Sequence, residues 1–182
     1  TFDLIFIALA LHHLGNPDLL LQKLWKKLRK PGVLIVRGSD DGLKVNYPDD
    51  SDLDFLLATT NNIPNSSDRN NGRKIYKQLS KLAPKPNSIK MKFQVDSTVG
   101  MDKQQREDFF VDNYGFRADY AKRHAGITNA NSDLRLAFKL EDIIEKNKTR
   151  FIEDDSIFSV TVQNIGIAIK SSSENNTEED TG

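Results

Sequence analysis

Residues 2–38 read FDLIFIALALHHLGNPDLLLQKLWKKLRKPGVLIVRG, and their pattern predicts a strand, a helix and a second strand in succession. The first part, Phe2–Ala8, is almost continuously apolar, which is typical of a parallel strand that is covered on both faces. Asn16 is a good helix N-cap, and Pro17 suits the first helical position because the N–H that it lacks would have no intrahelical partner there. A helix is therefore expected after a short connection.

This helix is predicted to pack one face on the sheet and to end at a proline. Its apolar residues repeat at helical spacing in Leu20, Leu24 and Leu28. Pro31 and Gly32 end it, because proline disfavours helical geometry in the residue before it and glycine accepts a left-handed turn. Val33–Val36 is then a second buried strand, and a right-handed parallel crossover is the default connection. We therefore expect an α/β fold built on an open sheet.

The remaining elements are predicted from periodicity and from turn residues. Helices are expected at Asp52–Thr60, Asn70–Leu82, Asp102–Tyr114 and Ser132–Asn147, and strands at Ile89–Asp96 and Ile157–Lys170. Within the last strand, a β-bulge at Asn164–Gly166 is one interpretation of the pattern. Residues 1–170 are expected to form one domain, and the polar, acidic residues 171–182 a disordered tail.

The composition narrows the class of protein. The 182 residues include 26 basic and 26 acidic residues and no cysteine. Balanced charge gives no indication of a surface for nucleic acid or anionic lipid, and the lack of cysteine excludes disulfides, thiolate zinc sites and a cysteine nucleophile. The longest apolar run, Leu4–Leu11, is too short to span a bilayer. We expect a cytoplasmic protein without nucleic-acid or membrane partners, and the sequence leaves its oligomeric state open.

The opening region resembles the second half of class I S-adenosylmethionine-dependent methyltransferases. The resemblance rests on Phe2-Asp3-Leu4-Ile5, on Leu11-His12-His13-Leu14, on Asn16-Pro17 and on Leu28-Arg29-Lys30-Pro31-Gly32 ahead of a hydrophobic strand. It implies that the chain is the C-terminal part of a Rossmann-like methyltransferase sheet, strands four to seven, with helical insertions. Two further segments are similar to bacterial methyltransferase-domain proteins of unassigned substrate: Gly38 to Pro48, with Asp40-Asp41-Gly42, and Asp68-Arg69 to Tyr76, with Gly72-Arg73-Lys74.

The resemblance also implies a cofactor, S-adenosyl-L-methionine, and residues that bind it. Ile7, Ala8 and Leu9 would line its methionine and sulfonium side through backbone groups, with His12 nearby. The glycine-rich turn and the acidic residue that hold the rest of the cofactor in this family would precede Thr1. For His12 and its neighbour, the alternative is a hydrogen-bonded structural histidine.

In an open α/β sheet, ligands bind beyond the carboxyl ends of the strands, here after Ala8 and after Val36. In the second segment, Asp40 or Asp41 is a candidate catalytic base, and Arg37 is a candidate substrate-binding residue. The alternative for the two aspartates is ordinary turn chemistry, because Ser-Asp-Asp-Gly is common in turns. A metal site is not expected, because no third ligand follows at a recognisable spacing.

Polar residues on the helical insertions are further candidates for contact with a substrate. Tyr47, Arg73 and Tyr76 are predicted to bind substrate, and Arg117 could face the same pocket. The alternative for each of them is a role in packing or at the surface.

The leading hypothesis is methyl transfer from S-adenosylmethionine to a small-molecule acceptor, by a longer chain of which this sequence is a part. A second hypothesis is a catalytically silent Rossmann-like binding or scaffold module. A third is a nicotinamide-dependent oxidoreductase, for which the chain lacks a tyrosine and lysine pair of the usual spacing.

Overall fold

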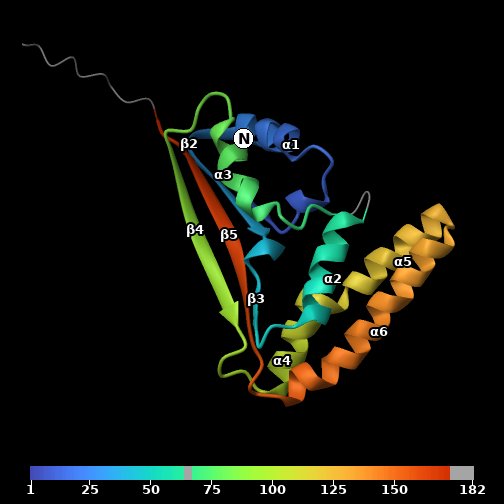
Figure 1. Cartoon of the computed structure of the whole chain (residues 1–182). Coiled ribbons are helices and arrows are strands. Elements are labelled where there is room, and N and C mark those ends of the chain that lie inside the picture. Colours follow the sequence, from blue (N-terminus) through green and yellow to red (C-terminus); the bar gives the residue numbers. More distant parts are fainter. Residues whose placement is uncertain (64–66, 173–182) are drawn as a thin grey trace, which may run out of the picture. The chain divides into compact units, whose positions relative to one another are not determined.

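The computed structural model describes residues 1–63 and 67–172 (Figure 1). The chain divides into two compact units. Unit 1 comprises Thr1–Ser39, Asn71–Gln94 and the chain from Gln163 onward, and unit 2 comprises Asp40–Asn70 and Val95–Val162. The single domain expected over residues 1–170 stays a prediction, and the predicted acidic tail lies outside the described residues from position 173.

Unit 1 is a mixed sheet with helices. Its elements are β1 (Phe2–Ala8), the 3-10 turn η1 (Leu11–His13), α1 (Pro17–Lys27), β2 (Leu28–Ser39), the 3-10 turn η3 (Gly72–Lys74) and α3 (Ile75–Ser80). Two long strands, β4 (Ser88–Ser97) and β5 (Phe158–Lys170), contribute residues to both units. β1 pairs parallel with β2, β2 pairs antiparallel with β5, and β4 pairs with β5. The predicted α/β class with an open sheet is confirmed.

Helix α1 begins as predicted and ends earlier than predicted. Asn16 Oδ1 accepts the Leu19 N–H at 3.0 Å, and Pro17 is the first helical residue. The helix stops at Lys27, not at Pro31, because Leu28 is already extended and pairs with Phe2 in the sheet. Strand pairing therefore outweighs the helical spacing of the leucines.

The core of unit 1 lies between one face of the sheet and helices α1 and α3. It includes Leu21, Trp25, Leu34, Ile75 and Leu79, all buried. Figure 1 shows the two helices beside the strands of this unit. Burial of these large side chains is the main driving force for the unit.

Gly166 allows α3 to approach β5 closely. A Cβ atom at this position would lie 2.4 Å from Ile75 Cγ2 and 2.7 Å from Leu79 Cδ1. The interpretation of Asn164–Gly166 as a β-bulge is wrong, because the β2–β5 register runs without a shift from Gly32 opposite Lys170 to the other end of the pair. The glycine serves helix packing instead.

Strand β1 is less covered than its sequence predicts. Leu4 and Phe6 are 57% and 58% exposed, whereas Ile7 is buried. Within the described residues β2 is the only strand paired with β1. The prediction that both faces of this strand are covered is therefore wrong for the described chain, because no described helix covers the face that carries Leu4 and Phe6.

Unit 2 is largely helical. Its elements are the 3-10 turn η2 (Asp41–Leu43), β3 (Val45–Tyr47), α2 (Ser51–Asn62), α4 (Lys103–Phe110), the π-helical turn η4 (Val111–Gly115), α5 (Arg117–Thr128) and α6 (Asn131–Glu153). β3 pairs antiparallel with the start of β5, Val45 lying opposite Val160. An aromatic cluster of Phe109, Phe110, Tyr114 and Phe151 anchors its core.

Candidate functional site

The turn after β1 holds a residue in an unusual backbone conformation. Leu9 has a φ of 50°, in the left-handed region, and its side chain is 38% exposed. The register places Ala8 opposite Arg37, and the Leu9 N–H donates to the Arg37 carbonyl at 2.9 Å. The turn is thereby fastened to the end of β2. A left-handed leucine costs on the order of 1 kcal/mol, and such conformations cluster at functional sites.

The predicted cofactor residues of this turn differ in exposure. Ala8 and Leu9 are exposed, whereas Ile7 and His12 are buried. The His12 ring lies in η1, with its centroid 3.9 Å from that of His13. The assignment of these four residues to cofactor binding stays a prediction.

Three predicted substrate residues also belong to unit 1. Arg37 Nε donates to Oε1 of Gln163 on β5. Arg73, in η3, and Tyr76, on α3, have exposed side chains. Ile75, which lies between Arg73 and Tyr76, packs closely on Gly38 at the end of β2. A Cβ atom at Gly38 would lie only 3.0 Å from Ile75 Cδ1. All three assignments stay predictions.

The two predicted catalytic aspartates begin unit 2, and both are buried. The Asp40 carboxylate accepts the Gly42 N–H at 3.0 Å and caps the turn η2. Asp41 lies among three cations: Arg117 Nη2 is 2.9 Å from Oδ2, Arg69 Nε is 3.5 Å from Oδ2, and Lys44 Nζ is 3.5 Å from Oδ1. The side chains of Asp41 and Arg117 are fully buried, that of Lys44 is 2% exposed and that of Arg69 is 11% exposed. We call these four residues the Asp41 cluster.

Burial and charge shift the pKa values within the Asp41 cluster. Burial pushes the pKa of Asp41 upward, but the charges of Arg117, Lys44 and Arg69 outweigh burial and lower it below the usual 3.8. Burial lowers the pKa of Lys44 to about 7, with a further lowering by the two arginines and an opposing effect of Asp41. A carboxylate with a lowered pKa is a weak base, so the cluster suits Asp41 to holding cations better than to taking up a proton.

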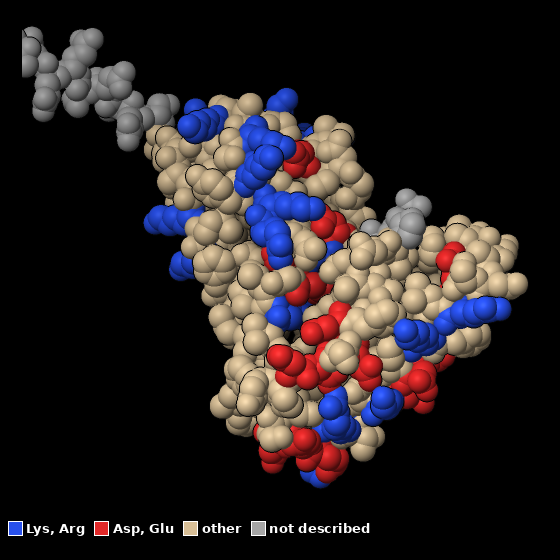
Figure 2. All heavy atoms as spheres, in the orientation of Figure 1, with Lys and Arg blue, Asp and Glu red and all other residues tan. Residues whose placement is uncertain are grey.

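Charged side chains at the surface are arranged differently from those of the Asp41 cluster. Lys and Arg side chains share the face drawn in Figure 2 with Asp and Glu side chains. Exposed pairs such as Lys148 with Glu107, at 2.6 Å, contain one charge of each sign. The Asp41 cluster has three cations for one carboxylate and is shielded from water.

Sequence reasoning missed two members of this cluster. Lys44 and Arg69 were not predicted as site residues, although the spacing of Asp41 and Lys44, three positions apart, is a signal for a pair in a helical turn. Arg117 was a candidate from its sequence. Tyr47, a predicted substrate residue on β3, is 66% exposed and pairs with Phe158 in the sheet.

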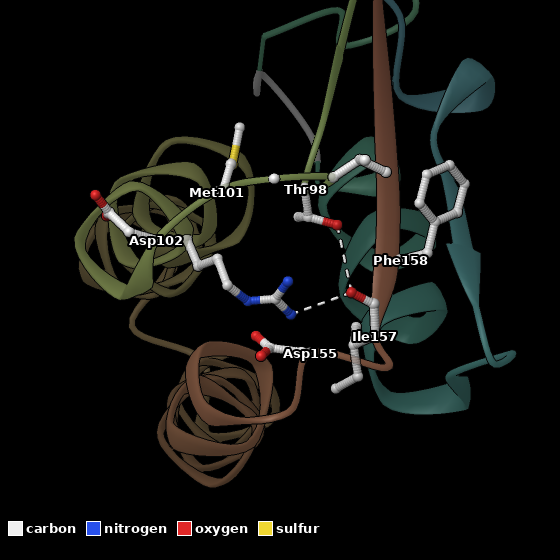
Figure 3. A pocket seen from close by; sticks show the side chains of 9 residues that line it. Thr98, Met101, Asp102, Asp155, Ile157 and Phe158 are labelled. Atoms are coloured by element: carbon white, nitrogen blue, oxygen red, sulfur yellow. Dashed lines mark hydrogen bonds between the residues drawn. The ribbon is translucent and has the colours of Figure 1, made fainter.

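A cavity of about 490 Å³ lies elsewhere in unit 2 (Figure 3). Its lining includes Thr98, Met101, Asp102, Arg106 and Phe158. The buried Arg106 donates to the carbonyls of three residues at and beyond the end of α6, which are Phe151, Asp154 and Ile157. This guanidinium therefore caps the negative end of a helix.

Residues 1–63 and 67–172 contain neither a candidate metal site nor a candidate membrane-spanning helix. No group of three or more His, Asp or Glu side chains is placed to hold a metal ion there. No helix in those ranges combines the length and the apolar character that crossing a membrane requires.

No protein-family model matches the sequence, and a search of curated proteins finds no match. The chain is similar in structure to methyltransferases. A Bacillus halodurans protein assigned as a methyltransferase matches with a TM-score of 0.44 and 14% identity over 94% of this chain and 65% of that chain. A phosphoethanolamine N-methyltransferase of Haemonchus contortus, in complex with phosphomonomethylethanolamine and S-adenosylhomocysteine, matches with a TM-score of 0.40 and 13% identity. This match covers 94% of this chain and 34% of that chain.

Coclaurine N-methyltransferase, bound to N-methylheliamine and S-adenosylhomocysteine, matches with a TM-score of 0.37 and 12% identity over 92% of this chain and 48% of that chain. The chain thus spans between about a third and two thirds of the length of these structures.

Proposed function

We propose that this chain belongs to a protein that transfers a methyl group from S-adenosylmethionine to a small-molecule acceptor. The observation that supports the proposal most directly is the turn after β1. An exposed residue in the left-handed region, Leu9, lies at the carboxyl end of a parallel strand and is fastened to the neighbouring strand. Ligands of open α/β sheets bind at this end of the strands.

The residues of the turn fit the group that the sequence resemblance implies. The exposed residues Ala8 and Leu9 would hold the methionine part, and the buried Ile7 and His12 would support the turn from within. S-adenosylmethionine, when bound, supplies a methyl group on a positively charged sulfur that a nucleophilic atom can displace in line. The protein's own task is then to align the acceptor and to exclude water.

The acceptor would be aligned by polar side chains predicted from the sequence. Arg37, Arg73 and Tyr76 in unit 1 are the proposed contacts, and Tyr47 in unit 2 stays a prediction from the sequence. Base assistance would come from Asp40 in preference to Asp41, because the pKa of Asp41 is lowered by its cationic neighbours. We propose a cytoplasmic location on the basis of the composition alone.

Calorimetric titration of the complete protein with S-adenosylhomocysteine tests the proposal. Heat of binding with a stoichiometry near one is expected. Leu9→Pro should abolish it, because proline cannot adopt a positive φ and removes the N–H that bonds to Arg37. Leu9→Gly is the matched variant, since it keeps the left-handed conformation and should keep binding.

A folded protein that takes up no cofactor would overturn the proposal and leave the silent binding module as the better hypothesis. Equal binding by Leu9→Pro and Leu9→Gly would remove the turn after β1 from the cofactor site.

A further inference from the structure

The Asp41 cluster gathers three basic side chains around one buried carboxylate. Asp41 lies within salt-bridge distance of Lys44, Arg69 and Arg117. Two guanidinium groups and the Lys44 amine thus share this carboxylate. Burying an unpaired charge is costly, and proteins normally pair such charges or use them to hold a ligand.

Arg117 has a nitrogen without a partner. Its Nε donates to the Asn113 carbonyl at 3.0 Å and its Nη2 to Asp41, but its buried Nη1 has no hydrogen-bond partner among the described residues. Asp41 Oδ1 likewise accepts no hydrogen bond within the described part of the chain, although Lys44 Nζ lies 3.5 Å away. Orphaned polar atoms of this kind are rare in native proteins and require an explanation.

Aromatic rings hold the cations in place. The guanidinium carbons of Arg69 and Arg117 lie 4.8 and 5.0 Å from the centroid of the Phe116 ring. Lys44 Nζ lies 5.3 Å from the Tyr114 ring and donates to Asn113 Oδ1 at 2.8 Å. Two guanidinium groups on one ring repel each other, and the Oδ2 atom of Asp41 is the anionic partner that they share.

We propose that Lys44, Arg69 and Arg117 bind the oxyanion group, a carboxylate or a phosphate, of a small acidic ligand. The inference concerns unit 2 by itself and does not depend on the proposed function. Arg69 is the least buried of the three cations and marks the side from which the anion enters. Asp41 then orients the cations, as a carboxylate that shares two guanidinium groups can.

A purely structural cluster is the competing explanation. In that case Asp41 would hold together the segments that carry residues 44, 69 and 117, and water would satisfy the orphaned atoms. The two explanations differ in their response to anions, because a structural cluster gains nothing specific from phosphate or acetate.

The test is calorimetric titration of the complete protein with inorganic phosphate and, separately, with acetate, at constant ionic strength. Saturable binding of at least one of the two is expected, and the stronger one identifies the oxyanion class. Arg69→Gln should weaken binding about tenfold or more, because it removes a charge-assisted hydrogen bond. Arg69→Lys keeps the charge and should retain most of the affinity.

Arg123→Gln is the matched control. It makes the same change of charge at an exposed position on α5, and its side chain packs on Tyr120 outside the cluster. Anion affinity should be unchanged. No saturable binding of either anion by the folded wild type, or an equal loss in Arg69→Gln and Arg123→Gln, would overturn the inference.

Titration of the same samples with S-adenosylhomocysteine separates the two proposals. Cofactor binding without anion binding would contradict the proposed oxyanion site and would remain consistent with methyl transfer. Anion binding without cofactor binding would retain the site and sink the methyltransferase proposal.

Discussion

The turns that follow β1 and β2 are held in opposite ways. The turn after β1 is fixed by its backbone, through the left-handed Leu9 and its bond to the Arg37 carbonyl, and its side chains are apolar. The turn after β2 is fixed by side-chain charge, because the carboxylate of Asp41 lies among three cations. Equivalent places on one sheet can therefore be made rigid by local strain or by buried electrostatics.

The difference bears on how each turn tolerates substitution. A backbone-fixed turn depends on φ and ψ, so it accepts any side chain that the conformation allows. A charge-fixed turn depends on particular groups, because each buried ion relies on the others for compensation. The turn after β1 should therefore be sensitive to substitution by glycine or proline, and the turn after β2 to loss of charge and to pH.

The largest effect is expected from Asp41→Ala. Removing the carboxylate breaks the fully buried ion pair of Asp41 with Arg117, and breaking a buried ion pair in this way costs about 3–5 kcal/mol. Urea denaturation followed by far-ultraviolet circular dichroism would report it, because α2, α4, α5 and α6 all belong to unit 2. Trp25, the only tryptophan, lies in unit 1, so its fluorescence provides a separate measure.

Asp142→Ala on α6 is the matched control, because that aspartate is exposed. Its stability should stay within about 0.5 kcal/mol of wild type. Equal effects of the two substitutions would show that the Asp41 cluster contributes no more than a surface charge.

An intermediate effect is expected from pH acting on Lys44. Its pKa is about 7 in the folded protein, against the usual 10.5, so between these values the unfolded chain binds one more proton than the folded one. Stability of the wild type should therefore rise with pH across this window, relative to Lys44→Met, by up to about 1.4 kcal/mol per pH unit. Asp41 stays ionised throughout, since its pKa is lowered.

Denaturation curves of the two proteins at pH 7, 8 and 9 would check this slope, and the upper limit avoids the titration of tyrosine. Parallel pH profiles would mean that Lys44 keeps its proton in the folded protein, contrary to the effect of its burial.

The smallest effect is expected at the turn after β1. Leu9→Gly removes strain of about 1–2 kcal/mol but adds about 0.5–1 kcal/mol of chain entropy, so stability should change by no more than about 1 kcal/mol. Leu14 is similarly exposed, at 40% against 38%, and has an ordinary φ of −100°. Leu14→Gly relieves no strain and should be the less stable of the two variants.

Trp25 fluorescence during denaturation follows this pair, because both leucines belong to unit 1. A greater loss of stability in Leu9→Gly than in Leu14→Gly would contradict the strain assigned to Leu9.

Sequence patterns predicted much of the fold because several elements have strong signals. The capped start of α1, the long alternation of β5 and the apolar run of β1 were recognised for what they are. Helix α5 was missed because its buried face consists of alanines at 118, 121 and 125, which give little hydrophobic contrast. β3 has three residues and is too short for a periodic signal.

The site was less predictable than the fold. The approach of Arg69 and Arg117 to Asp41 depends on tertiary packing across 28 and 76 positions of the chain, as the numbers of the paired residues show. A local pattern such as Ser-Asp-Asp-Gly indicates a turn and says nothing of what surrounds it. The left-handed Leu9 was equally invisible, because leucine is not a residue that signals positive φ.

The pairing of β2 with β5 has a consequence for the order in which the protein takes shape during synthesis. Gly32 lies opposite Lys170, so the middle of the sheet in unit 1 stays incomplete until almost all of the described chain has left the ribosome. Residues 95–162, by contrast, supply most of unit 2 as one continuous stretch and can assemble helix by helix as they emerge. During this time β2 lacks its β5 partner, so its free edge is open to incorrect association until β5 has been synthesised.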